Sequence, residues 1–477
     1  MKMMKKTKIV CTLGPASMDE ETVEKLALSG MNVVRLNFSH GSHEYHKEII
    51  NTVKRVRQKL GLPIAILLDT RGPEIRLGEI KGDGVILNEG DAFTLTTREV
   101  VGDSSAASLS YANLPKLVKK GTRILIDDGN VVLEVEGSTE TDINCRVVYG
   151  GKISSNKGVN VPNIHLDMPF LSEKDKKDIL FGIKNEVDFI AASFVRRKED
   201  VIELRRFLEE NGGGNIKIIS KIENTEGIEC FDDILERSDG IMVARGDMGV
   251  EVNYERLPGL QKRLIKKCFQ RGKIAITATQ MLESMINNPI PTRAEITDVA
   301  NAVFDGTSAV MLSAETAVGK YPVEAVKTMS KILVEAERDS QEMGTFKYID
   351  YEMDSKDTTN AVCHAARTLA IDLKARAIIA LSKSGNTARR MSKFRPDQPI
   401  VGVTPEIKTY YQLALSWGVY PVMARSHVEF DNLFRYAIER AKNVDMLSPG
   451  DRVVIVAGLP LDISGTTNLI KVEVVDE

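Results

Sequence analysis

Residues 216–280 read IKIISKIENTEGIECFDDILERSDGIMVARGDMGVEVNYERLPGLQKRLIKKCFQRGKIAITATQ. This stretch holds three short apolar runs, at 216–223, 240–247 and 273–280, separated by longer segments with helical spacing. Near-continuous Val, Ile and Ala runs are typical of strands that are buried on both faces, and alternation with helices indicates parallel pairing. The stretch therefore predicts three successive β/α units of an α/β fold.

The same alternation extends in both directions along the chain. Further apolar runs bounded by turn residues stand at 7–13, 32–38, 63–70, 188–195 and 308–315, which brings the predicted strands to eight. The segment after the second run has apolar residues at helical spacing from Ile49 to Leu60. Eight β/α units are the number in a (β/α)8, or TIM, barrel.

One insertion and one additional unit complete the expected architecture. Between Asp69 and about Pro169 the pattern changes to period-two strands such as DAFTLTT and VVLEVEG, which predicts an all-β domain that could act as a hinged lid. After Glu337 a polar stretch without periodicity is expected to be a linker, and from Ala361 helices and strands alternate again. We expect barrel segments at 1–69 and 169–342, the lid at 70–168, and a C-terminal α/β regulatory domain at 343–477.

Composition narrows the class of function. The 477 residues carry 64 Lys+Arg against 67 Asp+Glu, so no basic field predicts binding to nucleic acid or to an anionic membrane. The five cysteines are scattered, which argues against a disulfide framework and favours a reducing cytoplasm. No apolar run is long enough for a membrane span. The sequence also lacks the P-loop, the G-x-G-x-x-G and the protein-kinase motifs.

Charged residues at the C-terminal ends of the predicted strands indicate the active site, because barrel enzymes keep their chemistry there. Lys221 and Glu223 lie two residues apart, hence on one face of a strand, and a buried ion pair is the structural alternative. Asp247 comes from the neighbouring strand, and two carboxylates with open water positions suit Mg²⁺ or Mn²⁺. Lys221 would then be a fixed cation where phosphoryl charge develops.

Two polar clusters at other strand ends have weaker signals. Alternate residues Arg35, Asn37 and Ser39, with Asp69 and Thr70 on the next strand, offer the oxygens that a monovalent cation needs, or are simply satisfied polar groups at a barrel rim.

Three further groups have a functional and a structural interpretation each. The backbone N–H groups at Gly246 could hold a carboxylate, although Gly-Asp is also a common turn. Thr279 and Ser313 have hydroxyl groups that face the same mouth, where Ser and Thr often act only as local caps.

The loop SKSGNT in the C-terminal unit follows a strand and opens a helix. Its six residues, Ser382, Lys383, Ser384, Gly385, Asn386 and Thr387, are typical of a phosphate cradle at a helix N-terminus, with an ordinary N-cap as the alternative. A second polar turn at 464–468 could converge with it.

Ten motifs follow one another along nearly the whole chain: TKIVCTLGP, MNVVRLNFSHG, LLDTRGPEIR, NKGVNVP, ISKIENTEG, MVARGDMGVE, ITATQMLESM, PTRAE, DGTSAVMLSAETAVGKYP and SKSGNT. In this order they make the chain resemble pyruvate kinase. The resemblance implies transfer of phosphate from phosphoenolpyruvate to ADP, giving pyruvate and ATP as the last step of glycolysis, in a homotetramer. Met248 and Ala314 depart from the usual residues without removing a polar group. Since the sequence ends near Glu477, we expect no extra C-terminal domain of the kind that some bacterial members carry.

The resemblance also implies a role for each matched residue. Glu223 and Asp247 would bind Mg²⁺ or Mn²⁺, Lys221 and Arg35 would meet the phosphoryl group, Gly246 and Thr279 would assist the substrate, and Thr279 with Ser313 would order the water that protonates the enolate. The implied K⁺ ligands are Asn37, Ser39, Asp69 and Thr70, and the implied nucleotide contacts are Asn37, Phe38, Ser39, His40, Arg76 and Lys157. Glu74 stands where Glu accompanies K⁺ dependence in the family.

The regulatory ligand and two rival functions remain open at this point. Activation by a phosphorylated metabolite is expected. Because the turn GLPLDISG carries no Arg or Lys, a sugar monophosphate, AMP and a bisphosphate stay open as alternatives.

A barrel lyase or aldolase acting on metal-bound enolpyruvate would share Glu223 and Asp247 but would have no use for Arg76 and Lys157. A catalytically inactive metabolite-binding protein would be expected to have lost Lys221 or a metal carboxylate.

Overall fold

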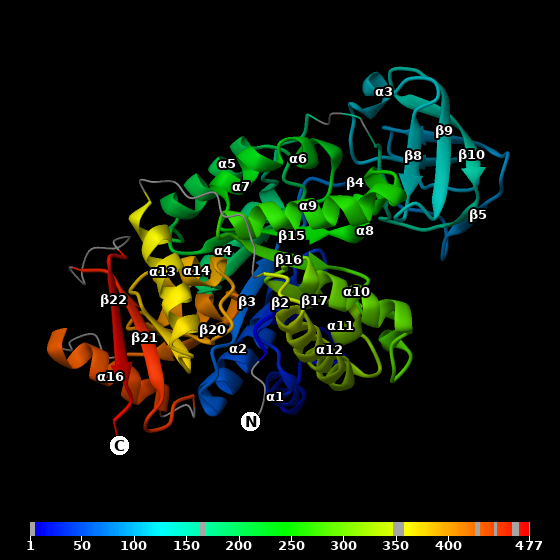
Figure 1. Ribbon diagram of the computed structural model, residues 1–477. Coiled ribbons are helices and arrows are strands. Elements are labelled where there is room, and N and C mark those ends of the chain that lie inside the picture. The colour runs from blue at the N-terminus through cyan, green and yellow to red at the C-terminus, as the bar shows by residue number, and fades with distance from the viewer. Residues whose placement is uncertain are drawn as a thin grey trace.

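A computed structural model describes residues 5–162, 164, 167–346, 357–424, 430–442, 446–459 and 467–476. Eight parallel strands close into a barrel in the order β1-β17-β16-β15-β14-β13-β3-β2, which confirms the predicted fold class (Figure 1). The barrel strands are β1 (Lys8–Thr12), β2 (Val33–Asn37), β3 (Ala65–Asp69), β13 (Phe189–Ala192), β14 (Lys217–Ile222), β15 (Gly240–Ala244), β16 (Ile274–Ala278) and β17 (Ala309–Leu312).

Helices surround this barrel and bury its outer face. The predicted helix after the second strand is α2 (His43–Leu60), and Ile49, Val53 and Val56 are fully buried along it. The others are α1 (Glu20–Ser29), α4 (Glu173–Lys184), α5 (Lys198–Glu210), α6 (Thr225–Glu229), α7 (Phe231–Arg237), α8 (Arg245–Glu251), η1 (Tyr254–Arg256), α9 (Leu257–Gln270), η2 (Glu283–Ile286), α10 (Arg293–Phe304), α11 (Ala314–Ala317) and α12 (Pro322–Glu342).

Two expectations about these segments were wrong. The polar stretch after Glu337 is not a linker from its start, because α12 continues to Glu342 and buries Ser340 on its inner face. Asp247 is not on a strand: β15 ends at Ala244, and Asp247 lies in the first turn of α8. In α12 a buried inner face outweighed the local polar composition, whereas at Asp247 the strand ends with the apolar run and the polar residues begin a helix.

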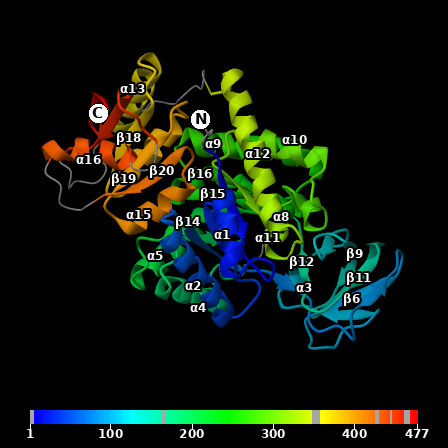
Figure 2. The same ribbon diagram turned by 90° about the horizontal axis from the view of Figure 1, so that it is seen from below.

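The inserted segment folds as the predicted all-β unit, which projects from one end of the barrel in Figure 2. A seven-stranded sheet has the order β4-β12-β8-β9-β10-β6-β7, and β11 pairs with β5 beside it. Its elements are β4 (Ile75–Arg76), β5 (Val85–Leu87), β6 (Ala92–Thr96), β7 (Ala106–Ser108), α3 (Leu114–Leu117), β8 (Arg123–Ile126), β9 (Val131–Ser138), β10 (Asp142–Tyr149), β11 (Gly151–Ile153) and β12 (Gly158–Asn160). The sheet has its own apolar core.

The C-terminal unit is a five-stranded sheet in the order β20-β19-β18-β21-β22. Its elements are α13 (Thr358–Asp372), β18 (Ala377–Leu381), α14 (Asn386–Lys393), β19 (Ile400–Thr404), α15 (Ile407–Gln412), η3 (Leu413–Leu415), β20 (Val419–Met423), α16 (Phe430–Lys442), β21 (Arg452–Ala457) and β22 (Leu469–Val474). The strands β20 and β22 were not predicted, and β22 is antiparallel to β21.

The barrel interior and the C-terminal unit share one apolar cluster. Ala414 and Leu415 from η3 pack against inward-facing barrel residues such as Val10, Phe189 and Ile219. The C-terminal unit therefore closes the end of the barrel at which the strands begin. No helix among the described residues is both long enough and apolar enough to span a membrane.

Candidate active site

Lys221 lies at the centre of the polar groups at the barrel mouth. Its ammonium group contacts three acceptors: Ser193 Oγ at 2.7 Å, Glu223 Oε1 at 2.9 Å and Asp69 Oδ1 at 3.2 Å. Burial alone would lower the pKa of Lys221, but Asp69 and Glu223 outweigh it and raise the pKa above its ordinary value. Lys221 is therefore a permanent cation, and the ion pair considered as the structural alternative is present.

Asp69 connects this cation to a second one. Arg35 donates from Nε to Asp69 Oδ2 at 2.6 Å and from Nη1 to Thr12 Oγ1 at 3.0 Å. Burial alone would raise the pKa of Asp69, but Lys221 and Arg35 together lower it. Two fixed positive charges thus flank one buried carboxylate at the mouth, as a site for a phosphoryl group requires. Thr12 was not predicted, since a threonine at a strand end gives no distinctive signal.

Glu223 follows directly after β14 and is almost fully buried, with 1% of its side chain exposed. Its Oε1 accepts from Lys221, and its Oε2 accepts from the backbone amide of Phe194 at 2.5 Å. Burial raises the pKa of Glu223 and the charge of Asp247 adds to this rise, while Lys221 opposes it. Two carboxylates near one another are a suitable donor pair for a divalent cation.

Asp247, Gly246 and Thr279 line a cavity of about 310 Å³ at the same mouth. Thr279 Oγ1 accepts from the Gly246 amide at 2.9 Å, so that hydroxyl fixes the turn before Asp247. Thr279 has φ of +67°, and Gln280 after it has +53°. Such left-handed backbone costs non-glycine residues of order 1–3 kcal/mol and is concentrated at functional sites.

Ser313, which follows the neighbouring strand β17, also lines this cavity. Its Oγ is buried without a hydrogen-bond partner among the described residues, and its amide donates to Glu315 Oε2 at 2.7 Å. An unpaired hydroxyl facing a polar cavity is available for water or substrate. The lid also reaches the cavity, through Asp128.

The residues suggested for a monovalent cation meet on neighbouring strands. Asn37 and Asp69 are register partners across β2 and β3. The Asn37 Oδ1 atom accepts from the Ser39 amide at 3.1 Å, and Thr70 Oγ1 accepts from the Ser193 amide at 3.1 Å. One carboxylate among neutral oxygens suits a weakly held cation such as K⁺.

The residues suggested for the nucleotide do not all have free side chains. Arg76 pairs with Glu74 at 2.6 Å and Lys157 with Asp127 at 2.8 Å, both within the lid. The Phe38 ring is buried and stacks on His46 at a centroid distance of 4.1 Å.

Only the backbone of Phe38 is thus placed to meet a ligand, whereas His40 is exposed. His46 is buried as well, stacked against the Phe38 ring.

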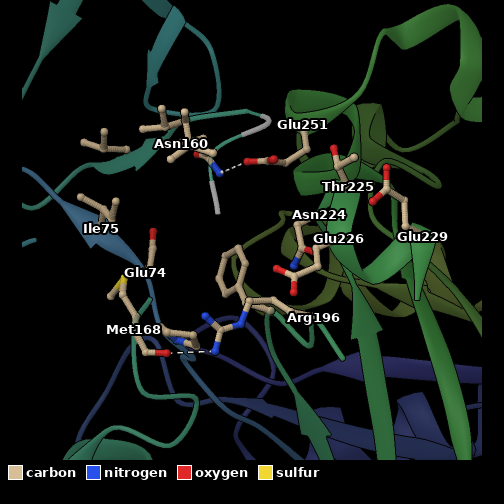
Figure 3. A pocket seen from close by; sticks show the side chains of 15 residues that line it. Glu74, Ile75, Asn160, Met168, Arg196, Asn224, Thr225, Glu226, Glu229 and Glu251 are labelled. Atoms are coloured by element: carbon tan, nitrogen blue, oxygen red, sulfur yellow. Dashed lines mark hydrogen bonds between the residues drawn. The ribbon is translucent and has the colours of Figure 1, made fainter. Parts of the chain in front are cut away.

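A second cavity, of about 360 Å³, separates the lid from the barrel (Figure 3). Asn160 of the lid donates to Glu251 of α8 across it at 3.4 Å. Burial raises the pKa of Glu251 to about 7, and the charge of Asp247 adds to the effect.

The C-terminal loop has a defined local geometry. Gly385 has φ of +78° directly before α14, where a Cβ would lie 2.7 Å from Arg389. The Thr387 amide donates to Ser382 Oγ at 3.4 Å, and Arg389 donates to the Ser384 carbonyl at 2.7 Å.

The second polar turn meets this loop. Thr467 Oγ1 lies 2.9 Å from Thr387 Oγ1, so the two turns converge as predicted. The rest of that turn, 464–466, and most of GLPLDISG lie outside the described residues.

Comparison with known proteins agrees with this geometry. The family model "Pyruvate kinase, barrel domain" matches residues 4–326, and "Pyruvate kinase, alpha/beta domain" matches residues 360–473. A pyruvate kinase of Clostridium acetobutylicum is 49% identical over 476 residues, covering 99% of this chain and all of that protein. Those of Staphylococcus haemolyticus and Sporosarcina psychrophila are 48% and 46% identical, and the match covers 99% of this chain and 81% of each of them. With both family models matched in order and an eight-stranded barrel that carries Lys221, Glu223 and Asp247 at its mouth, the chain belongs to the pyruvate kinase family of phosphotransferases.

Proposed function

We propose that this chain transfers the phosphoryl group of phosphoenolpyruvate to ADP, giving pyruvate and ATP. The arrangement that carries the proposal is Lys221, held by three acceptors at the barrel mouth beside Arg35. Transfer through a loose transition state needs cations around the equatorial oxygens and in-line positioning rather than covalent chemistry. Two fixed cations in a mostly buried site meet the first requirement.

Glu223 and Asp247 would hold the divalent cation, Mg²⁺ or Mn²⁺. Glu223 follows β14 directly, Asp247 lies in the first turn of α8 after the adjacent strand β15, and burial raises the pKa of Glu223. The cation, when bound, supplies Lewis-acid stabilisation of the carboxylate and enolate oxygens. The amide at Gly246 and the hydroxyl of Thr279 would orient the substrate beside it.

Proton delivery is assigned to two hydroxyl groups that line the cavity. The enolate left after transfer needs a proton on carbon, and Thr279 with the unpaired Ser313 hydroxyl would order the water that provides it. Lys221 would stay protonated, so it is not the acid. Phosphoryl stabilisation and protonation are thereby assigned to different groups, whereas Thr279 serves both substrate orientation and protonation.

K⁺ is the proposed monovalent cofactor, with Asn37, Ser39, Asp69 and Thr70 as its ligands. Asp69 supplies the single carboxylate and the others supply neutral oxygens, a set that suits a large, weakly hydrated cation. Glu74 lies beside Arg76 at the lid border, and we propose that it accompanies K⁺ dependence.

The nucleotide would lie between the barrel and the lid. The segment from Asn37 to His40 would contact it from the barrel, and Arg76 and Lys157 from the lid, which we delimit at 70–168. Both cations pair with lid carboxylates in this structure and would exchange them for nucleotide phosphates.

Regulation and assembly are further parts of the proposal. A phosphorylated metabolite would bind the loop 382–387, where Gly385 opens a helix whose N-terminal amides suit an anion. The apolar cluster shared by the barrel interior and the C-terminal unit would connect that loop to the active site. A homotetramer in the cytoplasm is the setting that we propose.

One assay tests the proposed activity against both rivals. Pyruvate formation is followed with phosphoenolpyruvate, ADP, Mg²⁺ and K⁺, omitting each in turn. ADP-dependent pyruvate formation supports the proposal. Turnover that ignores ADP would favour a lyase, and ligand binding without turnover would favour an inactive binding protein.

A further inference from the structure

We propose that Ser193 and Phe194, the turn that follows β13, position Lys221 and Glu223 for phosphoryl transfer. Ser193 would act through its hydroxyl group and Phe194 through its backbone amide. The inference rests on the proposed function, since it assigns positioning residues to the same site. Neither residue is distinguished by any pattern in the sequence.

The Ser193 hydroxyl lies within a complete hydrogen-bond network. It accepts from Lys221 Nζ at 2.7 Å and lies 2.6 Å from the Thr70 carbonyl. Its oxygen also lies 3.2 Å from Asp69 Oδ1. With 2% exposure, Ser193 cannot exchange these partners for bulk water. The single hydroxyl proton can go to the Thr70 carbonyl or to Asp69, and in either arrangement a lone pair faces Lys221.

Ser193 differs in kind from the other two partners of Lys221. An ammonium group has three N–H donors, and in this structure Ser193, Asp69 and Glu223 take all three. Asp69 and Glu223 are also the carboxylates proposed for K⁺ and for the divalent cation. Ser193 is thus the one acceptor with which neither cation competes, so it would hold Lys221 when both cations are bound.

Phe194 fixes Glu223 from the same turn. Its φ of +55° is left-handed, and this conformation directs the amide at Glu223 Oε2, 2.5 Å away. The other oxygen of Glu223 faces Lys221. One turn therefore orients both members of the Lys221–Glu223 pair, and the left-handed backbone is explained by that task.

The decisive variant is Ser193→Ala, with Ser220→Ala as its matched control. Ser220 precedes Lys221 and is fully buried, but its hydroxyl bonds to Ser238 on the other face of β14. Because a small displacement of a catalytic group can cost about 100-fold in rate, we expect kcat of Ser193→Ala to fall about 10- to 100-fold. The KM for phosphoenolpyruvate and the Kd for Mn²⁺, measured by titration without turnover, should stay within about threefold of wild type.

Further variants protect the test against misfolding. Ser193→Thr keeps the oxygen and should retain most of the wild-type kcat, whereas Ser193→Cys replaces it by a weak acceptor and should fall with Ser193→Ala. Phe194→Gly keeps the amide and tolerates the left-handed backbone, so its Kd for Mn²⁺ should match that of wild type. A tenfold weaker Kd in Phe194→Gly would assign the role to the phenyl ring instead.

The outcomes separate this inference from the proposed function. If the wild type forms no pyruvate from phosphoenolpyruvate and ADP, the proposed function fails. If the wild type is active and Ser193→Ala or, should that variant not fold, Ser193→Cys behaves like Ser220→Ala, the positioning role of Ser193 is overturned. Equal losses in kcat and in Mn²⁺ affinity would also overturn it, because they indicate a general structural role.

Discussion

Lys221→Met should abolish phosphoryl transfer while leaving the divalent cation bound. Methionine fills the same volume but removes the ammonium group that lies 2.9 Å from Glu223 Oε1 and 3.2 Å from Asp69 Oδ1. Loss of one charged donor to a developing oxyanion costs on the order of 100- to 1,000-fold in kcat. We therefore expect at least that loss in steady-state pyruvate formation.

The effect on the metal follows from the same distance. Two unit charges 2.9 Å apart attract each other by about 6 kcal/mol at an effective dielectric constant of about 20. A divalent cation must compete with that attraction for Glu223, so its affinity should stay equal or rise when Lys221 is replaced. Glu223→Ala removes the ligand itself and should weaken binding.

Titration with Mn²⁺, followed by the electron paramagnetic resonance signal of the free ion, measures both affinities. Thermal unfolding of each variant checks that the barrel is intact, since two buried carboxylates lose a partner in Lys221→Met. The reasoning is refuted if Lys221→Met loses Mn²⁺ affinity as strongly as Glu223→Ala does. The two residues would then form one structural unit rather than a metal ligand and a phosphoryl cation.

Four further predictions follow from other parts of the molecule. With Glu74 present, turnover in tetramethylammonium buffer should rise on addition of K⁺. Burial raises the pKa of Glu251 from 4.5 to about 7, so the unfolded chain loses this proton first and the carboxyl group destabilises the fold as pH rises from about 4.5 to 7; Glu251→Gln should add about 3 kcal/mol to the free energy of unfolding at pH 8 and nothing below pH 4.5. Gly240→Ala should cost about 1–3 kcal/mol, because its Cβ would lie 2.7 Å from Ile219 and 2.8 Å from Ile274, whereas Gly259→Ala meets nothing within 4 Å. Ser384→Glu should abolish the thermal shift produced by phosphorylated metabolites.

Each of these has a contradicting result. Equal turnover with and without K⁺ would remove the role of Glu74, and a pH-independent effect of Glu251→Gln would show that its carboxyl group is not buried in solution. Equal melting temperatures of the two glycine variants would contradict the close packing at Gly240. Absence of any ligand response in the wild type would end the proposal for the loop 382–387.

The sequence alone determined the number, direction and active end of the barrel strands. These features are local: apolar runs mark buried strands, alternation with helices sets parallel pairing, and parallel pairing places every C-terminal end at one mouth. Lys221, Glu223 and Asp247 could be selected for this reason, since charges at the ends of apolar strands need partners. The ten ordered motifs then identified the family.

Only the tertiary structure decided which atoms meet at that mouth. The acceptors of Lys221 stand at the C-terminal ends of three different strands, β3, β13 and β14, and the contact of Ser193 with Asp69 joins residues 124 positions apart. Barrel closure and strand stagger set such contacts, and neither is encoded in the period of a single segment. Ser193, Phe194 and Thr12 consequently gave no signal, and the end of α12 and the position of Asp247 were misjudged. Local patterns decide which way a side chain faces, whereas its partners depend on how the whole chain packs.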